Sequence, residues 1–270
     1  QVYTNQPHRE WIYRQAYVLG RHVIGYEVQK IRSAVDWLVR QDRDSSQPIG
    51  VVGWGEGGLL AFYSAALDTR IGSVLVSGYF GPRESLWAEP IYRNQFGFLR
   101  EFGDAEIARL ISPRSLFVEH APSPEVQGPP PPSPKRQSAA SGRIVTPKFA
   151  EVRAEVERAR QLCGPFASSV RWYHGTPDTT LGPVAESTLQ AFLQSLGAAR
   201  SDLAPAGAAP RELRPHFDPL QRQYRQVHEM ERFTQHLLQL SATSRDAFLW
   251  NKEKPTTPEA WREAMRPYRE

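Results

Sequence analysis

The sequence predicts an α/β fold in which a mainly parallel sheet is flanked by helices on both faces. Four short apolar runs rich in β-branched residues recur along the chain, helical apolar patterns separate them, and a glycine-rich turn joins the first run directly to a helix. This alternation is typical of parallel sheets, because each crossover helix returns the chain to the start of the next strand. We expect strands at 49–53, 73–77, 115–119 and 170–175. We expect helices at 25–40, from the turn to about residue 67, at 149–162 and at 184–196.

Composition excludes several classes of protein. The 270 residues carry 33 Lys+Arg against 29 Asp+Glu, a net charge of +4 that is scattered along the chain. This small excess gives no support for a nucleic-acid or membrane partner, and no apolar run approaches the ~20 residues that span a bilayer. Cys163 is the single cysteine, which excludes an intrachain disulfide and a cysteine metal site, and the seven histidines show no metal-binding spacing. We therefore expect no metal and no cofactor.

The glycine-rich turn is the most informative stretch of the chain. A β-branched run at 49–52 meets glycines at 53, 55, 57 and 58, and a helical apolar pattern follows. Gly53 and Gly57 stand two residues before and two residues after Gly55. A strand, a very sharp turn and a helix are the simplest interpretation, because glycines tolerate a strained turn and allow the helix to pack closely on the strand.

This turn resembles the nucleophile elbow G-x-S-x-G of the α/β-hydrolase superfamily. Over about residues 22–197, the chain is most similar to the dienelactone hydrolase and acetyl xylan esterase branch. Those enzymes carry the nucleophile at the elbow, an acid after a later strand and a histidine after the last strand. The resemblance implies that Gly55 occupies the nucleophile position and that Glu119 and His174 are the acid and the histidine. It also implies a carboxylic-ester hydrolase that acts on a small-molecule or carbohydrate ester.

The nucleophile itself is missing, because Gly55 has no side chain with which to form an acyl-enzyme. Two classes of function follow. One is an esterase with an unorthodox or relocated nucleophile. The other is a catalytically inactive hydrolase-like domain that serves as a binding module or as a scaffold for an active neighbouring domain. An intact G-x-S-x-G in flanking sequence would favour the second class.

Each remaining site residue has a structural alternative. Glu56 is a substitute nucleophile or, as we favour, a carboxylate that complements the helix dipole, while its backbone N–H and that of Gly57 form an anion-binding site. Ser77 is a relocated nucleophile or, more often for such a residue, a turn residue. Glu119 orients the histidine, or it caps the loop before Pro122 or pairs with an arginine. His174 is a catalyst, a relic or a structural residue.

Aromatic side chains near the elbow suggest a pocket. We expect Trp54, Ser77 and Tyr79 to line it, although core or lid packing explains the aromatic residues equally well.

The expected domain organisation has three parts. Residues 1–197 form the C-terminal portion of an α/β-hydrolase-like domain, with a Pro-rich insertion at 121–147 that we expect not to pack and to form a mobile or PPII-like excursion. Residues 198–219 form a linker, and 220–270 form a helical segment that starts a further domain. The first strands of a hydrolase sheet are not visible ahead of residue 22. Either an adjacent upstream domain of the same polypeptide completes the sheet, as we favour, or residues 1–20 fold in a way that the sequence does not predict. The sequence gives no prediction of localisation.

Overall fold

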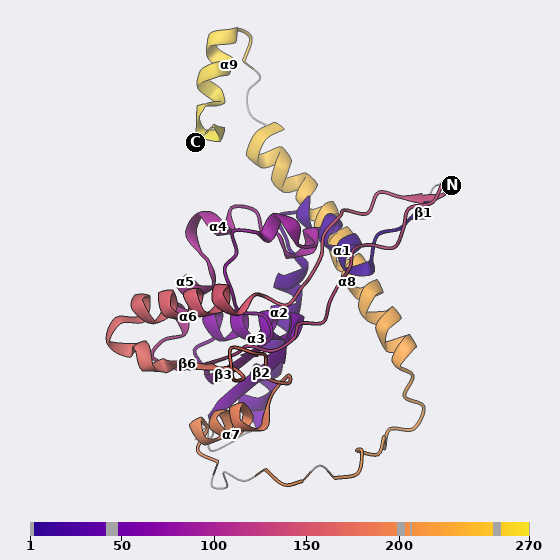
Figure 1. Cartoon of the computed structure of the whole chain (residues 1–270). Helices are drawn as coiled ribbons and strands as arrows, with labels where there is room; N and C mark the ends of the chain where they lie inside the picture. Colours follow the sequence, from indigo (N-terminus) through magenta and orange to yellow (C-terminus); the bar gives the residue numbers. More distant parts are fainter. Residues whose placement is uncertain (1–2, 42–47, 199–202, 206, 251–254, 270) are drawn as a thin grey trace.

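The centre of the molecule is a four-stranded parallel sheet. The computed structural model describes residues 3–41, 48–198, 203–205, 207–250 and 255–269. The strand order is β2-β3-β4-β6, so each strand of this sheet lies beside the next one in the chain (Figure 1). The four strands are β2 (Ile49–Trp54), β3 (Ile71–Ser77), β4 (Ser115–Glu119) and β6 (Val170–Tyr173). The predicted strands are confirmed to within two residues at each end.

Helices cover both faces of the sheet, as predicted. On one face Phe62 and Val156, from α3 and α6, pack with Val76 and Val118 in the main core. On the other face Leu75 and Phe117 pack with Phe192 of α7 in a smaller cluster. The helices that contact the sheet are α3 (Glu56–Leu67), α5 (Asp104–Ile111), α6 (Phe149–Cys163) and α7 (Glu186–Ser195), and α2 (Val23–Gln41) packs against α3.

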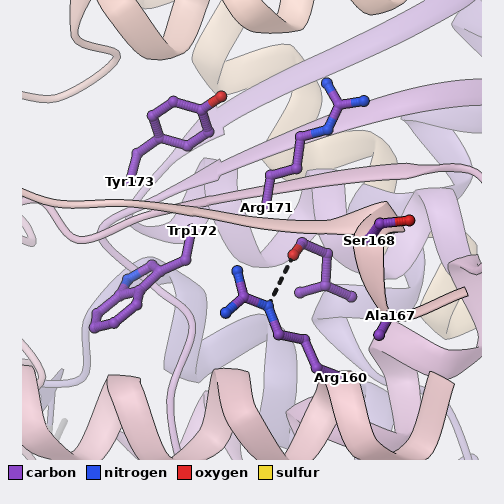
Figure 2. Close-up of a pocket in the computed structure, with 7 residues that line it drawn as sticks. Arg160, Ala167, Ser168, Arg171, Trp172 and Tyr173 are labelled. Carbon is purple, nitrogen blue, oxygen red and sulfur yellow. Dashed lines mark hydrogen bonds between the residues drawn. The ribbon is translucent and has the colours of Figure 1, made fainter. Parts of the chain in front are cut away.

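The two edges of the sheet differ in their protection. At β6, the Nε of Arg160 on α6 donates a hydrogen bond to the outward carbonyl of Val170 at 3.1 Å, and Arg171 lies over the Phe117 ring on the opposite face. A shallow hollow of about 550 Å³ remains between these groups (Figure 2). Charged side chains of this kind block unwanted strand pairing. The β2 strand contains no charged residue, and Val52 and Trp54 are 39% and 43% exposed.

A long helix packs beside the N-terminal part of the chain. α8 (Pro219–Arg245) is capped at its N-terminus by the side chain of Asp218 and runs past α1 (His8–Tyr17) (Figure 1). Trp11 Nε1 donates a hydrogen bond to Glu231 Oε1 at 3.1 Å. Tyr26 of α2 meets Phe233 edge to face, with ring centroids 5.7 Å apart. The predicted helix after residue 220 is therefore present, and it contacts the sheet-bearing unit. The predicted linker 198–219 includes residues 199–202 and 206, which lie outside the described part of the chain.

The Pro-rich segment 121–147 packs against the N-terminal residues, so the expectation of an unpacked excursion is wrong. Its short strand β5 (Arg136–Gln137) pairs with β1 (Tyr3–Thr4), and Asn5 Nδ2 donates to the Pro130 carbonyl at 2.7 Å. Ile144 is buried.

Across the described residues, no helix combines the length and the apolar character needed to cross a membrane.

The remaining elements are short. They are η1 (Leu86–Ala88), η2 (Ile91–Arg93), α4 (Phe98–Glu101), η3 (Gly164–Ser169), η4 (Asp246–Trp250), α9 (Pro258–Ala264) and η5 (Arg266–Tyr268).

Candidate functional site

The predicted sharp turn stands between β2 and α3. Gly55 has φ +56° and ψ −119°, a backbone conformation that residues other than glycine adopt only under strain. Its N–H donates to the Ser77 carbonyl at 2.9 Å, which ties the apex to β3. A Cβ at Gly53 would lie only 1.9 Å from the Gly57 carbonyl oxygen. Glycine at 53 is therefore required by the close approach of the helix to the strand, as the sequence predicted.

A loop occupies the space in front of the apex. A Cβ at Gly55 would lie 2.5 Å from Cδ of Pro124, so even a small side chain has no room there. Hydrogen bonds hold the loop in place: Trp54 Nε1 donates to the Pro122 carbonyl at 2.6 Å, Ser123 N donates to Thr146 Oγ1 at 3.0 Å, and Ser123 Oγ donates to the Gly78 carbonyl. The turn keeps the shape of an elbow, but its apex is covered.

Glu56 is held in a network of ion pairs. Its carboxylate pairs with Arg9 on one side and with Arg93 on the other. Arg9 also pairs with Glu27 at 2.6 Å, and Arg93 pairs with Glu89 at 3.0 Å. A carboxylate bound by two guanidinium groups is a poor nucleophile, which agrees with the structural alternative for Glu56. The anion-binding role of Glu56 and Gly57 stays a prediction.

Glu119 ends β4, and its buried carboxylate accepts three hydrogen bonds. Oε1 accepts from Ser77 Oγ at 2.6 Å and from Val184 N at 2.7 Å, and Oε2 accepts from Ala185 N at 2.8 Å. Val184 has φ +55°, an unusual value for a β-branched residue. The two backbone donors belong to the turn that starts α7, where a carboxylate is favoured. Glu119 thus fastens α7 to the sheet, and buried Ser77 is one of its partners.

His174 belongs to an aromatic cluster. Its Nδ1 shares a hydrogen bond with the Gly175 carbonyl at 2.8 Å. Its ring centroid lies 4.5 Å from that of Trp172 and 5.0 Å from that of Phe149. His120 touches the same Phe149 ring and is buried, and its pKa is lowered by burial and by the nearby charge of His174. The sequence pattern places His120 at the surface, and its burial shows that this expectation is wrong.

Glu119 and His174 lie on opposite faces of the sheet. Phe117 and Glu119 face α7, as does Tyr173, whose ring stacks on that of Phe117. Trp172 and His174 face α6 instead. Figure 2 shows this alternation, with Tyr173 and Trp172 on opposite sides of β6. Each residue has the place in chain order that the resemblance implies, but their hydrogen bonds are made to different partners.

The expected pocket residues are only partly accessible. Trp54 is exposed, whereas Ser77 and Tyr79 are buried. Tyr79 OH shares a hydrogen bond with Tyr63 OH at 3.3 Å, and the pKa of Tyr79 is raised by burial. Within the described residues, no cluster of three or more His, Cys, Asp or Glu side chains suits a metal ion.

Asp104 is a further buried carboxylate, which the sequence pattern places in a loop without a role. Asp104 begins α5 and is fully buried; Oδ2 accepts from Gly81 N at 3.1 Å and lies 3.4 Å from Arg83 Nε, while Oδ1 has no hydrogen-bond partner. Burial raises its pKa to about 7. The single signal in the sequence is an acidic residue after a glycine at the start of an apolar helical pattern.

Comparison with known proteins gives little. No protein-family model matches the chain, and no curated protein matches it. Among solved structures, a glucuronoyl esterase from Solibacter usitatus is similar to it, with a TM-score of 0.41 and 15% identity. The similarity covers 66% of this chain and 49% of the esterase chain, so this chain spans about half the length of that protein. A likeness at this level carries no conclusion about activity.

Proposed function

We propose that this chain is an α/β-hydrolase-like domain that does not carry out acyl transfer and that serves as a binding module or scaffold for an adjacent domain. The observation that carries the proposal is the covered apex: Gly55 offers no nucleophile, and Pro124 fills the place of its side chain. The placement of the acid adds support, since Glu119 accepts three hydrogen bonds from Ser77 and the start of α7 rather than one from His174.

The alternative is a carboxylic-ester hydrolase with a relocated nucleophile. Ser77 has a carboxylate beside it, but Ser77 is buried and donates a hydrogen bond to Glu119, to which no described histidine is hydrogen-bonded. Nucleophilic serines are activated by a general base that is free to take the proton and pass it on. The geometry therefore supports the non-catalytic function better.

An esterase assay separates the two. Hydrolysis of a short-chain aryl ester is measured for the parent chain, Gly55→Ser, Pro124→Gly and the double variant Gly55→Ser/Pro124→Gly, which has both the hydroxyl and the room for it. We expect the parent and both single variants to match the rate in buffer. Turnover by the parent that is lost in His174→Ala would overturn the proposal. Turnover gained by the double variant alone would show that the elbow was silenced at these two positions.

The β2 edge is the surface that we assign to the adjacent domain. Gly55 N–H points to β3, and successive peptide groups of a strand point to opposite sides, so the amides of Val52 and Trp54 point away from the sheet. Joining the adjacent domain to the chain is expected to slow hydrogen exchange of these two amides at least tenfold. Unchanged exchange would show that this domain does not cover the edge.

A further inference from the structure

A hollow of about 190 Å³ lies between α3, α4 and α5, and its lining includes none of the predicted site residues. α3 contributes Tyr63, Ala66 and Leu67, and α5 contributes Leu110. Phe98 of α4 and Phe102, which follows α4, form a further part of the wall. We propose that this hollow binds a small neutral aromatic molecule, of the size of an alkylbenzene. The proposal depends on the hollow alone and not on the elbow being inert.

The size of the hollow sets the size of the ligand. An apolar cavity of about 150 Å³ is enough for benzene. The 190 Å³ of this hollow therefore accommodates one ring with a short alkyl substituent. It does not accommodate a sugar with its ring of hydroxyl groups, because such groups would find few partners here.

Three aromatic rings form one wall and favour an aromatic ligand. The ring centroids of Tyr63 and Phe98 are 5.7 Å apart, as are those of Phe98 and Phe102, with tilts of 37° and 33°. Tyr63 OH shares a hydrogen bond with Tyr79 OH in the core, so Tyr63 presents the surface of its ring rather than its hydroxyl to the hollow. Further rings add favourably to such an arrangement, at about 0.5–1.5 kcal/mol for each well-placed pair.

The chemistry of the lining requires a neutral ligand. In this part of the described chain no lining residue is charged, and Gln95 supplies the amide at the hollow. Leu67 and Leu110 remain largely exposed at its margin. Water has few polar partners in such a place, so its replacement by an apolar group is favourable, whereas a carboxylate would lose hydration without gaining a partner.

Ligand binding tests the proposal. Ethylbenzene is titrated into the full chain and binding is followed by ligand-observed NMR, with benzoate as the charged match. Ala66→Leu fills the hollow from α3. Ala154→Leu makes the same change at an exposed position of α6 and serves as the control. We expect ethylbenzene to bind the parent and Ala154→Leu with affinities within twofold. Binding to Ala66→Leu, and benzoate binding to the parent, should each be at least tenfold weaker.

Several results would overturn the proposal: no ethylbenzene binding to the parent, equal binding to Ala66→Leu, or equal affinity for benzoate. Leu110→Gln provides a second variant if Ala66→Leu does not fold, because it places an amide in the wall and should also weaken binding tenfold. Sedimentation of the parent tests the other possible occupant of the hollow, a side chain from a second copy of the chain. A dimer that is lost in Ala66→Leu would show that a side chain of a second copy fills the hollow, and the small-molecule proposal would be wrong.

Discussion

The elbow and the acid-bearing end of β4 are held by different forces. At the elbow, close packing excludes side chains: the backbone carbonyl of Gly57 blocks a Cβ at Gly53, and the ring of Pro124 blocks a Cβ at Gly55. At the end of β4, the carboxylate of Glu119 is held by directed hydrogen bonds. The difference teaches that a strand–turn–helix can keep the form of an elbow through packing alone. An acid at the position in chain order where a hydrolase carries its catalytic acid can instead stabilise the fold.

Gly53→Ala should have the largest effect on stability. The added Cβ would lie 1.9 Å from the Gly57 carbonyl oxygen, a backbone atom that moves only with α3. We expect the free energy of unfolding in urea to fall by at least about 3 kcal/mol, the size typical of severe steric mutations. Gly57→Ala is the matched control, since nothing lies within 4 Å of its Cβ. It should leave stability unchanged or raise it by about 0.5–1 kcal/mol through helix propensity. Equal losses in both variants would show that the turn is not sterically fixed.

Glu119→Ala should come next. The change leaves Ser77 Oγ and two backbone N–H groups at the start of α7 without their acceptor. Unsatisfied buried donors cost about 1–3 kcal/mol, so we expect a loss of about 3 kcal/mol and faster hydrogen exchange at Val184 and Ala185. Glu119→Gln retains an acceptor oxygen and should lose less. If Glu119→Ala changed stability by under 0.5 kcal/mol, Glu119 would not be what fastens α7.

Asp104 sharpens the comparison, because it is a buried carboxylate with fewer donors. Its pKa, raised to about 7 by burial, means that the folded state binds a proton more tightly than the unfolded state. The resulting stability is fully present below pH ~4 and is lost as the pH rises towards 7. We expect the parent to lose roughly 1–3 kcal/mol over this range relative to Asp104→Asn, measured by urea unfolding at each pH. Parallel pH profiles for the two proteins would contradict this.

The sequence predicted the sheet and the turn well because both depend on local patterns. Apolar runs and glycine spacing fix the strands and the turn at 53–57, and they did so here without any long-range information. The placement of Glu119 and His174 depends instead on which way each strand faces. Chain order shows which residue ends a strand but not which face of the sheet its side chain is on. The alternation of Trp172 and Tyr173 assigns the faces only once the pairing Glu119↔Tyr173 is known.

Other features depend on contacts between distant residues. Pro124 reaches Gly55 across about seventy positions, and the composition of 121–147 suggested an unpacked segment. Arg9 and Arg93 meet at Glu56 from separate elements. No local pattern marks such pairs, and so the cover over the apex was not predicted.

The smallest expected effect is the most decisive for the comparison. His174 hydrogen-bonds to the adjacent Gly175 carbonyl and contacts rings on the α6 face, so His174→Ala should cost only about 0.5–1 kcal/mol. Glu119 lies on the α7 face and shares no partner with it. Independent sites give additive changes within about 0.5 kcal/mol. We therefore expect the double variant Glu119→Gln/His174→Ala to lose the sum of the single losses in urea unfolding. A coupling energy above about 1 kcal/mol would mean that the two residues interact as the acid and histidine of a working hydrolase do, and the structural role given to Glu119 would then be incomplete.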